Sequence, residues 1–272
     1  MSTYQAVLQS HLAEYKANRL GVQESGLFGG NGRVYRHILP SKLRQLNVLE
    51  PFRAEFWAYH KRHPEVRLHR YFHHLNSSQA LAFNLFFPFF TSGASARIAL
   101  TRSLGIASHV TRWKFEHVPN RLEGTNVDVA WCSPVGGWVY CEVKLSETEF
   151  GAATPDAQHR HKLEHIYAKR LSGLVKPELL EPNKFFRHYQ LLRNISFLSS
   201  PRVDHVVFLL PAANKALAAS LARVVDALQP LARGRVRVRY LEQVLQSLQH
   251  SAGLPPAVRQ CGKWLSEKYV PA

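Results

Sequence analysis

Residues 123–151, EGTNVDVAWCSPVGGWVYCEVKLSETEFG, contain the pattern that decides the fold. Residues 126–132 and 137–145 are two short runs rich in β-branched and aromatic side chains. They flank the tetrapeptide SPVG at 133–136, which is dense in turn-forming residues. The stretch therefore predicts a β-hairpin.

The predicted hairpin brings two carboxylates face to face. With the turn centred on Val135, Asp128 lies directly opposite Glu142. Because side chains alternate along a strand, both acids share one face with Lys144, and the other face is apolar. Like charges directly opposite each other destabilise a sheet. Either Lys144 or a hard divalent cation held by both carboxylates would offset this repulsion.

The chain is strongly basic. Its 272 residues include 35 Lys plus Arg and 19 Asp plus Glu, a formal charge of +16 that is spread over both halves and not confined to a tail. A hydrophobic content of 46% is enough for a substantial core. A folded body this positive suggests a polyanionic partner, most often nucleic acid. The alternative is a basic surface that only contacts solvent.

The three cysteines and the N-terminus bear on the cellular compartment. Cys132, Cys141 and Cys261 match no zinc spacing, and an odd number fits no closed set of disulfides. We expect the first two to be small core residues of the predicted strands. The N-terminus lacks the apolar segment of a signal peptide, and the most apolar run, residues 81–90, is too short to span a bilayer. These features favour a cytoplasmic protein without membrane segments.

Hydrophobic periodicity predicts the remaining elements. We expect helices over residues 3–19, 41–60, 77–87, 94–104, 157–174, 183–197 and 213–228, strands over 110–118, 204–210 and 235–239, and two helices at the C-terminus. No linker or internal repeat is visible, so one domain is predicted for residues 1–272. Within it, residues 1–75 form a helical elaboration, 76–211 the catalytic core and 212–272 a C-terminal extension.

The start of the apolar helix near residue 77 carries a polar side chain that fits two interpretations. Asn76 is a candidate N-cap, and Gln79, three residues later, completes a capping box. Alternatively, Gln79 points toward a functional site. The frequency of capping boxes favours the first interpretation.

Two later helices carry candidates for binding phosphates. The stretch 157–174 is basic, and its histidines lack an acidic partner at metal-ligand spacing, which favours a solvated or phosphate-contacting face. In the helix 183–197, polar residues at positions 183, 187, 190 and 194 form a stripe. The candidate nucleic-acid-binding residues of these helices are Arg160, Lys162, Lys169, Arg170, Arg187 and Arg193.

The order helix, strand, strand, strand, helix, strand around the hairpin resembles the PD-(D/E)XK nuclease superfamily, in a bacterial restriction-endonuclease-like branch. Asp128, thirteen intervening residues and Glu142-Val143-Lys144 match its acid and E-x-K motif. The resemblance covers roughly residues 30 to 211 and implies an α/β (α+β) fold. Its core would be a mixed sheet of about four to five strands flanked by helices, with an N-terminal helical elaboration and a C-terminal helix-strand-helix extension.

The resemblance also implies a mechanism. Asp128, Glu142 and the backbone carbonyl of Val143 would bind Mg²⁺ or Mn²⁺, and Lys144 would orient or help deprotonate the attacking water. Attack in line with the leaving group would leave a 5′-phosphate and a 3′-hydroxyl. Asp128, Glu142 and Lys144 are therefore the predicted catalytic residues.

The chain departs from the family pattern in one respect. Many members carry an additional acid on the first core helix, where this chain offers only Gln79. Glu116 is the first candidate to replace that acid at the metal, and Glu123 and Glu149 are others. Glu116 is equally suited to an exposed ion pair with Lys114 or Arg112. Gln79 and Gln190 are predicted supporting residues of the site.

These features together predict a Mg²⁺-dependent DNA endonuclease that acts in restriction, phage defence, mobile-element processing or repair. A non-catalytic nucleic-acid-binding module of the same fold and an RNA-directed nuclease are the alternatives. Because cutting two strands usually takes two active sites, a homodimer is also expected.

Overall fold

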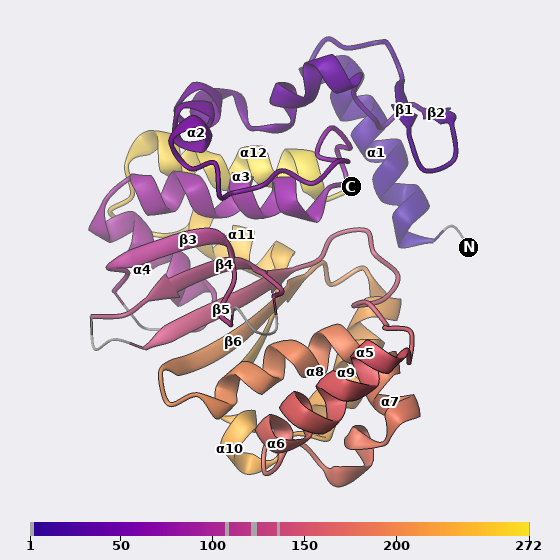
Figure 1. Cartoon of the computed structure of the whole chain (residues 1–272). Coiled ribbons are helices and arrows are strands. Elements are labelled where there is room, and N and C mark those ends of the chain that lie inside the picture. Colours follow the sequence, from indigo (N-terminus) through magenta and orange to yellow (C-terminus); the bar gives the residue numbers. More distant parts are fainter. Residues whose placement is uncertain (1–2, 107–108, 121–123, 135–136, 272) are drawn as a thin grey trace. The chain divides into compact units, whose positions relative to one another are not determined.

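The computed structural model describes residues 3–106, 109–120, 124–134 and 137–271. The chain divides into two compact units (Figure 1). The first unit combines residues 1–109 with 240–272, and the second contains residues 110–239. These limits differ from the expected ones at residues 75 and 211, and the single domain stays a prediction.

The first unit is mainly helical, as predicted for its N-terminal part. Its elements are α1 (Tyr4–Arg19), β1 (Gly26–Phe28), β2 (Arg33–Tyr35), the 3₁₀ helix η1 (Ser41–Asn47), α2 (Glu50–Arg62), α3 (Ser78–Thr91), α4 (Ala94–Ser103), α11 (Leu241–Gln249) and α12 (Pro256–Tyr269). The antiparallel pair β1–β2 lies between the helices predicted over residues 3–19 and 41–60, where no strand was predicted. The helix expected over 41–60 is two helices, because Pro51 starts a new one in its first turn.

Helix α3 is buried on all sides, as its apolar sequence predicts. Its N-cap is Ser77, whose hydroxyl accepts a hydrogen bond from the backbone N–H of Ala80. The prediction that Asn76 caps this helix is therefore wrong by one residue. Ser77 occupies the extended conformation that an N-cap requires.

The second unit is built on a five-stranded mixed sheet, which confirms the predicted fold class. The strands are ordered β3 (Arg112–His117), β4 (Val127–Cys132), β5 (Trp138–Val143), β6 (Val203–Leu210) and β7 (Val236–Tyr240). The pairs β3–β4 and β4–β5 are antiparallel, and β5–β6 is parallel. The parallel pair requires a long crossover, and the helices between β5 and β6 provide it.

The register of β4 against β5 is the one predicted from the sequence. Val129 pairs with Cys141 and Trp131 with Val139, so the numbers of paired residues add to 270. Continued by one residue, this register sets Asp128 opposite Glu142. The predicted turn centre, Val135, lies outside the described residues, as does Gly136.

The crossover begins with a helix that switches from α-helical to π-helical hydrogen bonding and back. It runs through α5 (Ala157–Lys162), a π-helical turn (Leu163–Tyr167) and α6 (Ala168–Leu171). Three short helices follow: η3 (Pro177–Leu180), α7 (Pro182–Arg187) and α8 (Tyr189–Ser196). The single helix expected over 183–197 is wrong, because His188 leaves the helical conformation with φ −113° and separates α7 from α8. The predicted polar stripe is therefore interrupted.

The unit ends with the predicted helix-strand arrangement. The 3₁₀ turn η4 (Phe197–Ser199) leads into β6, and α9 (Lys215–Asp226) and α10 (Pro230–Arg233) lead into β7. Asn214 caps α9: its side-chain oxygen accepts from the N–H of Leu217, and its amide donates to the carbonyls of Leu145 and Glu147. The cap thus ties α9 to the segment that follows β5.

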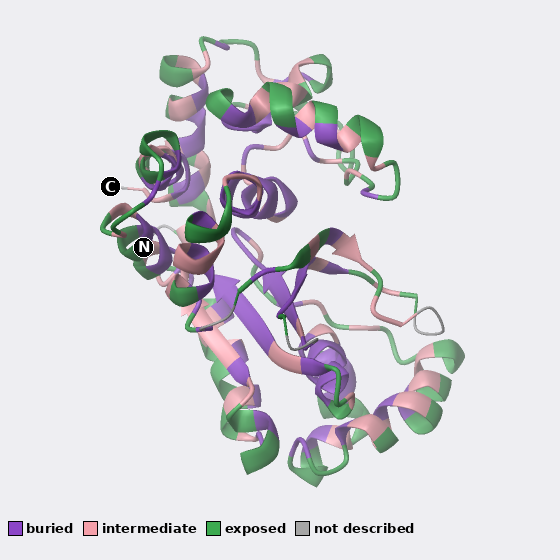
Figure 2. Cartoon of the chain, turned by 90° about the vertical axis from the view of Figure 1, so that its left-hand side faces the viewer, coloured by how far each residue is buried: buried purple, intermediate pink, exposed green. Residues whose placement is uncertain are grey.

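The centre of the sheet is buried (Figure 2). Cys132 and Cys141 lie in this core as predicted, and Cys261 is buried in the first unit; all three are free thiols. Over the residues for which a structure is described, no helix has the length and apolar character needed to cross a bilayer.

Candidate active site

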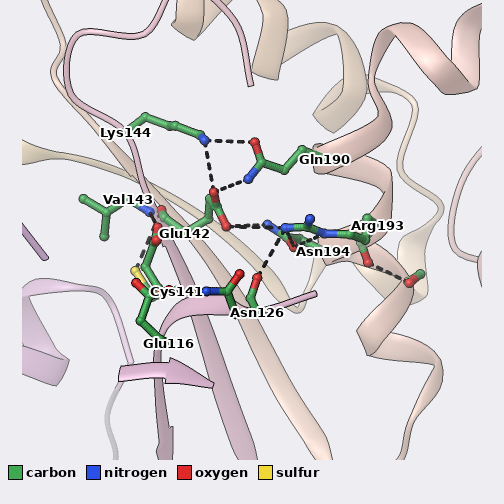
Figure 3. Close-up of polar contacts among 11 residues, drawn as sticks. Glu116, Asn126, Cys141, Glu142, Val143, Lys144, Gln190, Arg193 and Asn194 are labelled. Carbon is green, nitrogen blue, oxygen red and sulfur yellow. Dashed lines mark hydrogen bonds and ion pairs between the residues drawn. The ribbon is translucent and has the colours of Figure 1, made fainter. Parts of the chain in front are cut away.

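The predicted cluster of Asp128, Glu142 and Lys144 is assembled at the end of β5. Figure 3 shows the contact between Glu142 and Lys144. Lys144, directly after β5, places its Nζ 3.1 Å from Oε1 of Glu142. On β4, Oδ2 of Asp128 accepts a hydrogen bond of 2.7 Å from the backbone N–H of Val143. Glu142 is 4% exposed and Lys144 9%, so this ion pair is shielded from solvent.

Helix α8 supplies two amides that fix the carboxylate of Glu142. Gln190 donates to Oε1 of Glu142 at 2.6 Å, and Asn194 donates to Oε2 at 3.0 Å. The side-chain oxygen of Gln190 accepts from Lys144 at 2.9 Å. Glu142, Lys144 and Gln190 therefore form a closed ring of polar contacts (Figure 3).

Gly151 allows Gln190 to lie where it does. Its carbonyl accepts from the backbone N–H of Gln190 at 3.1 Å. Its φ is +106°, and a Cβ at this position would lie 2.9 Å from the side-chain oxygen of Gln190. Both the backbone conformation and the close approach favour glycine here.

Arg193 joins the same network from the face of α8 that also carries Gln190 and Asn194. It is 8% exposed, and its Nη2 lies 4.0 Å from Oε2 of Glu142. The guanidinium also donates to the side chain of Asn194 and to the carbonyl of Asn126. Its polar contacts are thus with the site itself, and its predicted role in binding nucleic acid stays a prediction.

Glu116 lies in the same row of the sheet as the two acids. Phe115 pairs with Val129 and His117 with Val127, a register that sets Glu116 opposite Asp128. The Glu116 carboxylate accepts a hydrogen bond from the side-chain amide of Asn126. Among the described residues it is the one non-glycine residue with positive φ, at 49°. Such strain is commonly stored near functional sites.

The electrostatics of the site follow from this crowding of acids. Burial, followed by the nearby charges of Glu142 and Glu116, raises the pKa of Asp128 well above its usual value, and Lys144 and the Val143 N–H only partly offset this. Burial alone would lower the pKa of Lys144. The surrounding carboxylates, led by Glu142, outweigh burial and raise that pKa. Lys144 is therefore an ammonium that neutralises one of the acids.

Three further residues were predicted near the site: Gln79, Glu149 and Glu123. Gln79 belongs to the first unit, where its side chain donates to the carbonyl of Arg67 and accepts from the N–H of His69. It thereby braces the segment before α3. Glu149 is exposed in the loop after β5, and Glu123 lies outside the described residues.

The basic candidates on the crossover are spread over its surface. Arg160, Lys169 and Arg187 are exposed, and Lys162 and Arg170 are half-buried. The backbone carbonyl of Pro155 accepts a hydrogen bond from Arg160, which also lies at the start of α5. The exposed residues Arg160, Lys169 and Arg187 present positive charge at the surface of the crossover.

Sequence reasoning missed two polar side chains of the site. Asn194 is visible in the sequence only as part of a polar stripe, although its 1% exposure and its bond to Glu142 make it part of the acid's support. Asn126 connects Glu116 and Arg193. The signal for Asn194 was its position one helical turn after Gln190, on the polar face of an amphipathic helix. Asn126 carried no such signal.

The acids present do not form a full set of metal ligands by themselves. In the described part of the chain, no three side chains of His, Cys, Asp or Glu converge as they would around a metal ion. The paired carboxylates of Asp128 and Glu142 nevertheless offer the hard oxygen atoms that Mg²⁺ prefers.

A five-stranded mixed sheet with an Asp on one strand and Glu-x-Lys on the next defines the restriction-endonuclease-like class of nucleases. The comparison with protein families agrees: residues 9–270 match the family described as "Restriction Endonuclease associating with ARP". The chain belongs to this family. No curated protein and no solved structure matches it.

Proposed function

We propose that this protein is a metal-dependent DNA endonuclease that hydrolyses phosphodiester bonds. The observation that carries the proposal is the convergence of Asp128, Glu142 and Lys144 on one face of the β4–β5 hairpin. Family membership supports the nuclease class. The choice of metal and of DNA as the substrate belongs to the proposal.

The charge of the site fits a hard divalent cation. Burial and the nearby charge of Glu142 raise the pKa of Asp128, and Lys144 neutralises only one of the two carboxylates. Asp128, Glu142 and the carbonyl of Val143 would hold Mg²⁺ or Mn²⁺. With so few protein ligands, water would complete the shell, as Mg²⁺ usually requires. When bound, such a cation lowers the pKa of a coordinated water and stabilises charge on the phosphate.

Side chains of the protein would supply the remaining catalytic contributions. The ammonium of Lys144 would orient the attacking water and stabilise negative charge that develops on the phosphate. Gln190 would position Lys144, since it bonds both that ammonium and Glu142. Asn194 would keep the second oxygen of Glu142 in place. The basic crossover would bind the phosphate backbone of the substrate.

The test is digestion of supercoiled, linear and single-stranded DNA, with RNA alongside, in Mg²⁺ and in Mn²⁺. We expect cleavage by the wild type, none in EDTA, and a loss of at least about 100-fold in Lys144→Ala, by analogy with other groups that stabilise transition-state charge. Lys215→Ala, an exposed lysine of α9, is the matched control and should cleave normally. Cleavage of RNA alone would change the substrate class. Unchanged cleavage by Lys144→Ala would overturn the proposal.

One observation favours a second candidate, a non-catalytic nucleic-acid-binding module. Both oxygens of Glu142 already accept hydrogen bonds, and the described residues bring no third acid to complete a metal site. This candidate predicts DNA binding that weakens with salt and no turnover with any divalent metal. The digestion series separates the two.

A further inference from the structure

The second unit contains a cavity of about 540 Å³ beside the candidate active site. Its walls come from β3, β5 and the segment between α8 and β6. This volume is in the range of pockets that hold small organic ligands. Six of its lining residues carry the argument: His117, Trp138, Tyr140, Arg170, Phe197 and Arg202.

Aromatic rings form one wall of the cavity. The ring of His117 stacks on that of Trp138 with centroids 5.1 Å apart and planes 18° apart. Tyr140 continues the row, 6.2 Å from Trp138, and meets Phe197 edge to face at 5.4 Å. Trp138 and His117 are half-buried, so part of each ring surface remains open. A row of this kind can extend its stack by one more planar ring.

Cationic groups accompany this aromatic wall. Arg170 and Arg202 line the cavity, and Arg202 is exposed. The guanidinium of Arg112 lies 5.8 Å from the ring centre of Trp138. Burial, together with Lys114, lowers the pKa of His117 to about 4, so its ring is neutral at physiological pH. The cavity therefore combines apolar stacking surface with groups that bind phosphate.

The cavity lies next to the carboxylates, because strand β5 and the segment from Asn194 to Phe197 contribute residues to both. Tyr140 and Glu142 are two residues apart on β5, about 7 Å along the strand and on the same face. On the opposing segment, Asn194 bonds Glu142, and Phe197, three residues later, packs on Tyr140. A strand of substrate held at the acids would thus have its neighbouring nucleotide beside the aromatic wall.

We propose that this cavity receives one unstacked nucleobase of the substrate strand. The base would stack on the open part of the Trp138 ring, beside the buried Tyr140, and the flanking phosphates would contact Arg170 and Arg202. The inference rests on the proposed function for its substrate class. Because unstacking a base is easiest in single strands and at mismatches, it further implies a preference for such DNA over perfect duplex.

Binding of single-stranded oligonucleotides in EDTA tests the proposal without cleavage. A fluorescent single-stranded DNA oligonucleotide is compared, by anisotropy, with one of equal length that carries only abasic sugars. We expect Trp138→Ala to weaken binding of the oligonucleotide with bases about 5- to 100-fold, as removal of a stacking ring does. Its binding of the abasic strand should equal that of the wild type. Trp138→Phe should retain most of the affinity.

Two controls guard against a folding defect. Trp113 belongs to β3, where it pairs with Trp131 and faces away from the side that carries Arg112 and Trp138. Trp113→Ala should bind both strands like the wild type, and circular dichroism should be unchanged in all variants. Equal losses of Trp138→Ala on both strands, or no loss, would overturn the proposal. So would binding of dAMP or dTMP as tight as that of the oligonucleotide, because the cavity would then be a site for free nucleotides.

The same variants separate this inference from the proposed function. Cleavage in Mg²⁺ together with base-independent binding would refute the base pocket alone. Base-dependent binding that Trp138→Ala abolishes, with no cleavage under any metal, would support the pocket and refute the endonuclease.

Discussion

Asp128 and Glu142 repel each other in the folded protein, and that repulsion has a measurable effect on stability. Burial, followed by the charges of Glu142 and Glu116, raises the pKa of Asp128, so the folded state holds its proton to higher pH than the unfolded chain, whose Asp pKa is about 3.9. This contribution to stability is fully present below about pH 3.9 and is lost as pH rises toward the raised pKa of the folded state.

Asp128→Asn should therefore stabilise the metal-free protein at pH 7 by about 1 kcal/mol, the upper range for a cross-strand pair. The amide oxygen of Asn can still accept from the Val143 N–H. The gain, measured by thermal unfolding in EDTA, should shrink toward pH 4. A gain that is equal at both pH values would contradict this origin.

Addition of Mg²⁺ should make the wild-type protein more stable than Asp128→Asn. Wild-type protein should unfold at a higher temperature as Mg²⁺ is added, because a ligand that binds only the folded state stabilises it. Asp128→Asn should respond much less, since it lacks one of the two carboxylates. Identical Mg²⁺ responses of the two proteins would argue against a metal at this pair.

Under the proposed function, Gln190 positions Lys144 and Glu142, and its removal should lower activity without unfolding the protein. Gln190→Ala loses contacts to both Lys144 and Glu142. Partners of this kind typically account for 10- to 100-fold in activity or metal affinity, and we expect a decrease of about that size in cleavage rate. Gln158→Ala, an exposed position on α5, is the control and should cleave like the wild type.

At the scale of elements, the segment after β5 depends on the cap of α9. Asn214 is 4% exposed and bonds the carbonyls of Leu145 and Glu147 as well as the first turn of its helix. Asn214→Ala should lower the free energy of unfolding by about 2 kcal/mol, from the lost cap and the carbonyls left without a partner. Urea unfolding measures it. Thr3→Ala, an exposed cap of α1, should cost less than half as much.

Gly151 links the loop after β5 to helix α8. Gly151→Ala would strain a backbone at φ +106° and push its Cβ against Gln190. We expect a loss of about 1–3 kcal/mol in stability and a lower cleavage rate. Gly173, with φ +74° and no atom within 4 Å of the position that a Cβ would occupy, is the matched control. Its alanine variant should lose stability but not activity.

Some features of these elements could be predicted from the sequence and others could not. The hairpin register was predictable because the turn residues at 133–136 fix its centre, and this centre puts Val129 and Trp131 on the same face as Cys141 and Val139. The break at His188 was not, because both flanking stretches have helical periodicity and no proline or glycine lies between them. Asn126 could not be assigned to the site, because its neighbours Glu116 and Arg193 come from distant parts of the chain.

At the scale of the whole molecule, the charge of +16 should appear in the salt dependence of DNA binding. Each phosphate contact adds about −0.9 to the slope of log K against log salt. The double variant Lys162→Ala/Lys169→Ala should reduce the magnitude of that slope by about 2. Lys176→Ala/Lys215→Ala removes the same charge from exposed positions outside the crossover helix and should change the slope less. Equal effects of both pairs would mean that net charge alone attracts DNA.

The ring formed by Lys144, Glu142 and Gln190 has a consequence for the resting protein. The ammonium serves as a built-in counter-ion, so the chain can fold in a cell before any divalent ion arrives. Under the proposed function, Glu142 would also hold the divalent cation, and Lys144 would then be released from Glu142 to orient the water. Metal binding and activation of Lys144 would thus occur together, and the protein without metal would not cleave DNA.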